Sequence, residues 1–151
     1  MALEFKIQVQ EWKNVLLRGH DDAKREKYWG KFQSQHDKVQ ALGNKVITLT
    51  AKSDTKDLTK AFLAEHKALL DKYKTGYNAF IASNYNHMAG DKAVSGIDRE
   101  PTKMATEITE LAFKQAQDNF NHSPWHRALQ VFPDTLQGYL EKCEQCSETD
   151  A

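Results

Sequence analysis

The sequence predicts an all-α protein, an antiparallel up-and-down four-helix bundle with a short extra C-terminal helix. Three observations lead to this prediction. Apolar residues recur at alternating steps of three and four through long segments, only 7 glycines and 3 prolines occur in 151 residues, and the breaks between the periodic segments are short. That recurrence places apolar side chains on one face of a helix. Short connections make consecutive helices antiparallel neighbours.

The longest periodic segment covers residues 23–51. Its predicted inward-facing residues are Tyr28, Phe32, Gln35, Val39, Leu42, Val46 and Leu49. Only Gln35 is polar among them, and no proline interrupts the segment. At a rise of ~1.5 Å per residue, the helix would be roughly 40 Å long. A helix of this length with one apolar face needs partner helices to bury that face.

A shorter helix is expected before it, over residues 3–18. Its inward positions are Phe5, Val9, Trp12 and Leu16. Gly19 marks its end, and Asp21 and Asp22 are suited to cap the next helix. Because this first helix is much shorter than its partners, we expect either that upstream residues complete it or that Gly19 is only a kink.

The third helix is expected to begin at Ser53 or Asp54, because both side chains can cap a helix start. It should run to about residue 84. Its inward positions are Leu58, Phe62, His66 or Glu65, Leu69, Tyr73, Gly76 and Phe80. This helix has nearly the same length as the second one and supplies it with a partner.

The fourth helix is expected to start near Asp91, after a loop over residues 85–91. Its inward positions are Val94, Ile97, Met104, Ile108 and Leu111. Pro101 lies at an inward position and should kink the helix or start it afresh. Residues 1–121 are therefore predicted as the bundle domain, and residues 122–151 as a C-terminal extension with a short helix over 133–142 and a polar tail.

The composition excludes several classes of function. Lys plus Arg and Asp plus Glu both number 21, so the zero net charge gives no bulk attraction to nucleic acid. No window of ~18 apolar residues could span a membrane, and no secretory leader is visible. No Ser/His/Asp set, glycine-rich phosphate loop or paired carboxylate stands out, so we expect no enzyme. Gly30 and Gly43 are interpreted as close contacts between helices.

Two stretches carry a resemblance to a known family. Residues 8–19 read QVQEWKNVLLRG and are followed by Tyr28-Trp29, and residues 96–101 read GIDREP. Together they resemble the extracytoplasmic sensing domain of a subset of bacterial methyl-accepting chemotaxis receptors. The resemblance covers roughly residues 5–121, and residues 122–151 do not match the family's pattern.

The resemblance implies a dimeric four-helix sensor that binds a small molecule or a binding protein and passes a small helix displacement inward. It implies a position at the periplasmic face of the inner membrane. The membrane would be reached only through flanking segments that are absent from this sequence. We therefore expect a small-molecule ligand and a homodimer, with no nucleic acid. An interaction module without a ligand stays open as a further hypothesis.

The polar and aromatic residues inside the two stretches are candidate ligand-binding residues: Trp12, Arg18, Trp29, Asp98 and Arg99. The cations suit an anionic group, and the aromatic rings suit an apolar body. The alternative interpretation is structural. The two tryptophans would then pack in the core, while Asp98 and Arg99 would cap and pair at the start of a kinked helix.

A metal- or haem-binding helical bundle is the alternative function. His122, His126, Cys143 and Cys146 could form a tetrahedral zinc site from two imidazoles and two thiolates. The alternative for the cysteines is a disulfide or free thiols in the tail, and no other cofactor is expected.

The histidines on the second and third helices are the other candidates for a metal. His36 and His66 lie on or beside the apolar faces of neighbouring helices. If the chain turns near Ser53, residue 36 lies opposite residue 71 or so. His66 would then be offset from His36 by more than a turn, close to 7 Å. We expect both rings to bond to polar neighbours.

Overall fold

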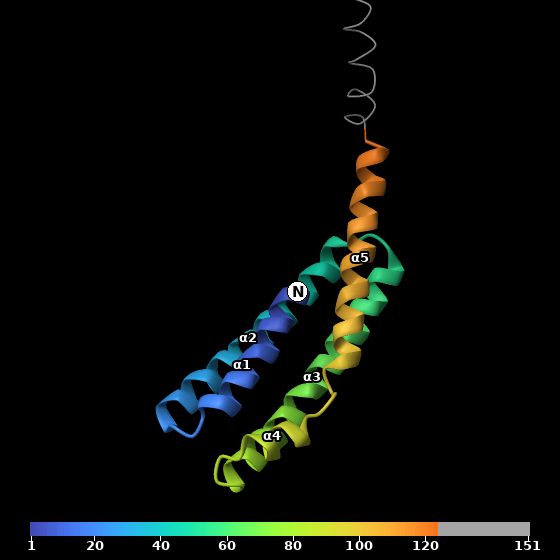
Figure 1. The fold of residues 1–151 in the computed structure, drawn as a ribbon. Helices are drawn as coiled ribbons and strands as arrows, with labels where there is room; N and C mark the ends of the chain where they lie inside the picture. Colours follow the sequence, from blue (N-terminus) through green and yellow to red (C-terminus); the bar gives the residue numbers. More distant parts are fainter. Residues whose placement is uncertain (124–151) are drawn as a thin grey trace, which may run out of the picture. The chain divides into compact units, whose positions relative to one another are not determined.

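The computed structural model describes residues 1–123, and the regular structure of that part is entirely α-helical (Figure 1). The helices are α1 (Ala2–Arg18), α2 (Asp22–Leu49), α3 (Ser53–Ala82), α4 (His87–Ala93) and α5 (Arg99–Asn121). Residues 1–112 form one compact unit, and the last turns of α5 belong to a second one. The predicted all-α class is confirmed. The predicted helix over 133–142 lies outside the described residues.

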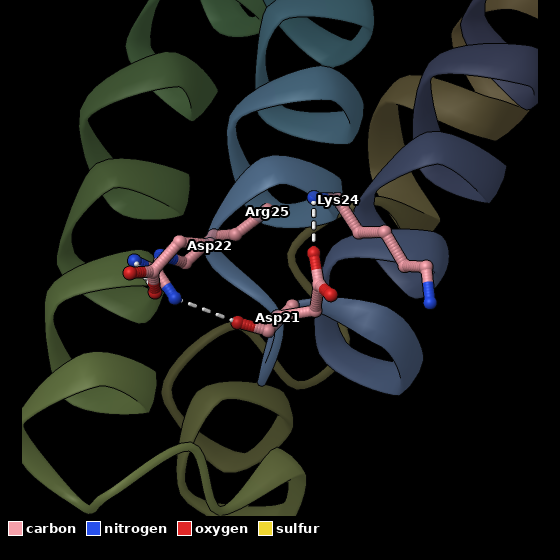
Figure 2. A network of polar contacts seen from close by, with 5 residues as sticks. Asp21, Asp22, Lys24 and Arg25 are labelled. Atoms are coloured by element: carbon pink, nitrogen blue, oxygen red, sulfur yellow. Dashed lines mark hydrogen bonds and ion pairs between the residues drawn. The ribbon is translucent and has the colours of Figure 1, made fainter.

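The turn between α1 and α2 is fixed by local polar contacts. Asp21 caps α2, since its Oδ1 accepts a hydrogen bond from the backbone N–H of Lys24 at 2.9 Å (Figure 2). Arg25 donates to the carbonyl of Gly19 at 2.9 Å and to Asp22 at 2.6 Å. Its guanidinium also lies 4.8 Å from the centre of the Tyr85 ring. These contacts tie the α1–α2 turn to the segment that follows α3.

Helices α1 and α2 run antiparallel along each other. Trp12 meets Phe32 with ring centroids 6.4 Å apart, and Gln8 meets His36 at 3.4 Å. The earlier residue of α1, Gln8, therefore meets the later residue of α2, His36. Partner positions that change in opposite directions show that the two helices are antiparallel.

Helices α2 and α3 are paired in the same way. Trp29 stacks on Tyr77 with centroids 4.4 Å apart, and the amide of Gln40 donates to the carbonyl of Leu63 at 3.1 Å. Helices α1, α2 and α3, each antiparallel to the next, therefore supply most of the described core, and residues at the end of α4 and in α5 add to it. Its buried apolar residues are Phe5, Trp12, Val15, Leu16, Phe32, Val39, Phe62, Leu63, Leu69, Tyr73, Phe80, Val94, Ala105 and Ile108.

The predicted apolar faces are largely confirmed, with Leu49 as the exception. Leu49 is 73% exposed. The pairing of Trp12 with Phe32 places the first residues of α1 opposite residue 42 or so of α2. The last two turns of α2 therefore extend beyond α1, and Leu49 has no α1 side chain to cover it.

Of the two glycines interpreted as close contacts, only Gly43 is one. A Cβ on Gly43 would overlap with the Leu63 side chain, whereas a Cβ on Gly30 would meet nothing within 4 Å. A further close approach was not predicted. It lies between α3 and the end of α4, where a Cβ on Gly76 would come within 2.7 Å of Val94.

The segment predicted as a loop and a single fourth helix forms two helices instead. Helix α4 begins at His87, inside the predicted loop, because the Asn86 side chain caps it by accepting from the Met88 N–H at 3.0 Å. Helix α5 starts afresh at Arg99, so Pro101 stands in its first turn. A proline is tolerated there because the first N–H groups of a helix have no partner within it.

Candidate functional site

A small pocket lies where α1 and α3 meet α4 and the start of α5. It has a volume of about 220 Å³ and is lined by Val9, Trp12, Lys13, Tyr73, Asp91, Val94, Ser95, Gly96, Asp98 and Arg99. We call it the Trp12 pocket. Three of the five predicted ligand-binding residues, Trp12, Asp98 and Arg99, thus come together in space although 86 positions separate Trp12 from Asp98 in the sequence.

The other two predicted residues, Arg18 and Trp29, do not line this pocket. Arg18 is exposed and donates to the Tyr28 hydroxyl at 2.6 Å. Trp29 is half-buried and stacks between Phe32, at 5.1 Å, and Tyr77, at 4.4 Å. The structural interpretation therefore describes Trp29 well, since its ring packs α2 against α3.

Trp12 lines the pocket and has an unsatisfied hydrogen-bond donor. Its side chain is only 2% exposed, and its indole contacts the rings of Tyr73 and Phe32 at 5.3 and 6.4 Å. Among the described residues, its Nε1 is the buried side-chain polar atom without a hydrogen-bond partner. Leaving such a donor unpaired costs about 1–3 kcal/mol. An unpaired buried donor of this kind is unusual in folded proteins.

The charged groups at the pocket are mixed in sign. Lys13 from α1 and Arg99 from α5 supply cations, and Asp91 and Asp98 supply carboxylates. Gly96, in the connection between α4 and α5, has a positive φ of 75° that suits glycine. A Cβ there would lie 3.5 Å from Nε of Arg99, so the guanidinium passes close to this turn.

Tyr73 adds a hydroxyl from α3. Burial raises the pKa of Tyr73 well above its ordinary value, and the nearby carboxylates of Asp98 and Asp91 raise it further. The phenol therefore stays protonated and keeps its donor at any physiological pH. Together, the indole N–H, the phenol and the two cations can bind an acceptor-rich small molecule. The carboxylates of Asp91 and Asp98 can accept a hydrogen bond from a donor group on the same molecule.

A second, larger cavity of about 660 Å³ lies between α1 and α4. It is lined by Lys13, Leu16, Leu17, His87, Met88, Asp91, Lys92 and Ser95. Lys13, Asp91 and Ser95 also line the Trp12 pocket. The residues of the pocket that were not predicted as site residues include Lys13, Tyr73, Asp91 and Ser95. The position of Lys13 beside Trp12 and the predicted inward position of Tyr73 were signals, whereas Asp91 and Ser95 depend on the unpredicted course of α4.

The predicted metal site falls almost entirely outside the described residues. His126, Cys143 and Cys146 lie there, so zinc binding stays a prediction. His122 is described, and its Nδ1 donates to the carbonyl of Asp118 at 2.7 Å. Within residues 1–123, no group of three or more His, Cys, Asp or Glu side chains is placed to hold a metal ion. The described residues therefore add no support to the metal or haem alternative.

The predicted offset between His36 and His66 is wrong. Their rings stack with centroids 4.4 Å apart and an interplanar angle of 14°. Helix α2 ends at Leu49 and α3 begins at Ser53, so the connection is centred on residue 51 and residue 36 faces residue 66. The expectation that both rings bond to polar neighbours is confirmed, since each bonds to Gln8.

The described residues form an all-α domain with a small pocket at a junction of helices. No helix within residues 1–123 has the length and apolar character needed to cross a membrane. Comparison with known proteins agrees with the resemblance of the two stretches. The chain is 40% identical over 117 residues to the methyl-accepting chemotaxis protein CtpH of Pseudomonas aeruginosa.

This match includes 77% of the chain but only 20% of the relative, so the chain spans about a fifth of that protein's length. The identity supports kinship with methyl-accepting chemotaxis proteins, and it supports the expectation that the chain is not an enzyme. No protein-family model matches the sequence, and no solved structure matches it either.

Proposed function

We propose that this chain is the ligand-sensing domain of a transmembrane chemotaxis receptor, placed at the periplasmic face of the inner membrane. The observation that carries the proposal is the 40% identity to a methyl-accepting chemotaxis protein over most of the chain. The helical architecture and the unpaired donor of Trp12 add independent support, because a sensor needs a site that is completed by its ligand.

The Trp12 pocket is the proposed ligand site. Its indole N–H and the cations of Lys13 and Arg99 suit the oxygen atoms of a small anionic molecule. The neighbouring cavity beside Leu16 and Met88 offers apolar surface for the rest of such a molecule. The Trp12 pocket has a volume of about 220 Å³, which at ~30 Å³ per water molecule leaves room for a small anionic group and part of the molecule that carries it.

The site suggests how binding would be transmitted. Trp12 and Lys13 belong to α1, whereas Asp98 and Arg99 lie at the start of α5. A ligand held by both would change the position of α5 relative to α1, provided that it binds one arrangement better than the other. We propose that α5, with Pro101, Ala105 and Ile108 buried, is the fourth helix of an antiparallel bundle, and that the domain works as a homodimer.

A thermal-shift screen of the purified chain with amino acids, organic acids and sugars tests the ligand site. We expect at least one compound to raise the melting temperature. The same compound should lose its effect on the Arg99→Gln variant. It should keep its effect on Lys45→Gln, which removes an exposed cation of α2 that lines neither cavity.

Sedimentation of the same samples tests the dimer. We expect association that the active compound strengthens. A chain that stays monomeric and responds to no compound would contradict the proposed function. The flanking sequence of the parent gene is a separate check, because apolar segments of membrane-spanning length on both sides are expected.

A further inference from the structure

A chain of hydrogen bonds crosses the core and joins three helices. Nε2 of Gln40, on α2, donates to the carbonyl of Leu63 at 3.1 Å and lies 2.8 Å from Nδ1 of His66, on α3. Nε2 of His66 lies 2.7 Å from Oε1 of Gln8, on α1. Nε2 of Gln8 lies 3.4 Å from Nδ1 of His36, on α2. We call these four side chains the histidine–glutamine chain.

Each side chain of the histidine–glutamine chain donates to the next one, in the order Gln40, His66, Gln8, His36. Because Gln40 donates its amide protons, Nδ1 of His66 must accept, and the proton of this ring sits on Nε2. That proton is donated to Oε1 of Gln8. The amide of Gln8 then donates to His36, whose Nδ1 must also accept. Both imidazoles are therefore neutral, and every bond of the chain depends on the direction of the others.

The surroundings favour the neutral rings. His66 is fully buried and His36 is 5% exposed. Phe62 stacks on His66 at 5.6 Å, and Phe5 meets its edge at 5.3 Å. Burial lowers the pKa of His66 to about 3 and also lowers that of His36.

Few charged groups face the pair. Besides burial, which lowers the pKa of His36, Asp37 on α2 raises it and Lys74 on α3 lowers it. On α1, Lys6 is exposed, and the carboxylates one turn before and one turn after Gln8 belong to Glu4 and Glu11. Glu11 accepts a hydrogen bond from Asn14 at 3.1 Å. Glu4 is engaged as well, with Lys38 at 2.9 Å and Gln35 at 2.8 Å. A proton on either ring would therefore gain little compensation, and a second proton would repel the first across the 4.4 Å stack.

A single added proton would disturb the whole chain. His36 is the ring that keeps some contact with solvent, so the added proton would bind to His36 first. A proton on its Nδ1 removes the acceptor that Gln8 uses, and the Gln8 amide must turn. Its NH₂ group then faces the N–H of His66, so that this ring must move its proton to Nδ1. Gln40 must turn in response and lose its bond to Leu63.

We propose that the histidine–glutamine chain is a proton sensor, a second input to this domain besides the ligand. Acidification would protonate His36 and either break its bond to Gln8 or reverse the chain with loss of the Gln40–Leu63 bond, and both outcomes loosen the packing among α1, α2 and α3. The proposal is independent of the Trp12 pocket, since none of the four side chains lines that pocket. The proton-sensor proposal can therefore be wrong while the ligand-sensing proposal is right, and the ligand-sensing proposal can be wrong while the proton-sensor proposal is right.

The test measures the separation of α1 and α3 as a function of pH. Spin labels are placed on Lys6→Cys and Lys67→Cys, two exposed positions, after Cys143 and Cys146 are changed to Ser. We expect the distance distribution to shift or broaden reversibly between pH 7.5 and pH 5, while the helix content by circular dichroism stays constant. The His36→Gln variant should lose this response, and His20→Gln, at an exposed histidine, should keep it.

A second measurement covers the case in which His36→Gln does not fold. Imidazole nitrogen spectra of the wild-type chain should show both rings neutral with the proton on Nε2 at pH 7.5. The signal of His36 should titrate over the pH range in which the distance changes. An unchanged distance down to pH 5, a change that occurs only with loss of helix, or a full response in His36→Gln would overturn the proposal.

Discussion

The indole ring of Trp12 lies edge-on against the phenol ring of Tyr73, with centroids 5.3 Å apart and an interplanar angle of 64°. The contact joins α1 to α3 at the wall of the Trp12 pocket. It holds the indole in a fixed orientation although its N–H has no partner. The two rings therefore combine a structural role with the donor that the proposed ligand would use.

Replacing Trp12 by Phe separates these two roles. The smaller ring keeps most of the aromatic packing and removes the unpaired donor, so the free energy of unfolding should fall by no more than about 2 kcal/mol. Trp12→Ala should lose about 3–5 kcal/mol because it leaves a cavity. Urea unfolding measures both values. In binding assays, Trp12→Phe should weaken an active ligand at least about tenfold, since a hydrogen bond to a charged group contributes about 1.5–3 kcal/mol.

The approach of α3 to α4 predicts opposite effects for two glycines. Gly76→Ala should destabilise the chain by about 1–3 kcal/mol, because its new Cβ would lie 2.7 Å from Val94. Gly30→Ala should stabilise it by about 0.5–1 kcal/mol, since alanine is the better helix former and nothing lies within 4 Å. Thermal unfolding of the two variants side by side measures the difference. Equal effects would contradict the described packing of α4.

The buried histidines predict a loss of stability in acid. Folding lowers the pKa of His36 and of His66 from the ordinary value of 6.5, so the unfolded chain binds more protons below pH 6.5. The stabilisation is complete above that pH and is lost as the pH falls toward the folded-state pKa values. For His66 that value is about 3. Each buried histidine should contribute up to about 1 kcal/mol of loss per pH unit.

Urea unfolding at pH 7.5, 6 and 5 measures this slope. His66→Gln should be less stable than wild type at pH 7.5 because it disturbs the packing of the core. Its stability should nevertheless depend less on pH over this range. A slope that is the same in wild type and in His66→Gln would show that other groups control the acid sensitivity.

The sequence was sufficient to predict α1, α2 and α3, because each has an apolar face that continues over many turns. Phe5 and Trp12 on α1 and Phe62 on α3 were all placed inward and are buried. Helix α4 was not predicted, since its seven residues are too few to show a period. The break before Arg99 was one of two outcomes expected from Pro101, and the sequence offered no basis for choosing between them.

The candidate site was predictable only in part. Trp12, Asp98 and Arg99 were named from the stretches that carry the family resemblance, and the fold places all three at one pocket. Tyr73 was predicted to face inward but was not assigned to the site, and Asp91 could not be added because its position depends on how α4 packs against α3. The stacking of His36 on His66 was not predicted because the turn between α2 and α3 was expected near Ser53, whereas it is centred on residue 51. An error of this size in the centre of a turn changes which residues of the two helices face each other.

The indole N–H signal of Trp12 in a two-dimensional ¹H–¹⁵N spectrum tests the central claim most directly. The signal is assigned by its absence in Trp12→Phe and followed while the purified chain is titrated with each compound that raises its melting temperature. We predict that this N–H, unpaired in the free chain, shifts on binding while that of Trp29 moves little. A compound that binds and shifts other signals but leaves the Trp12 N–H unchanged would contradict the proposed site.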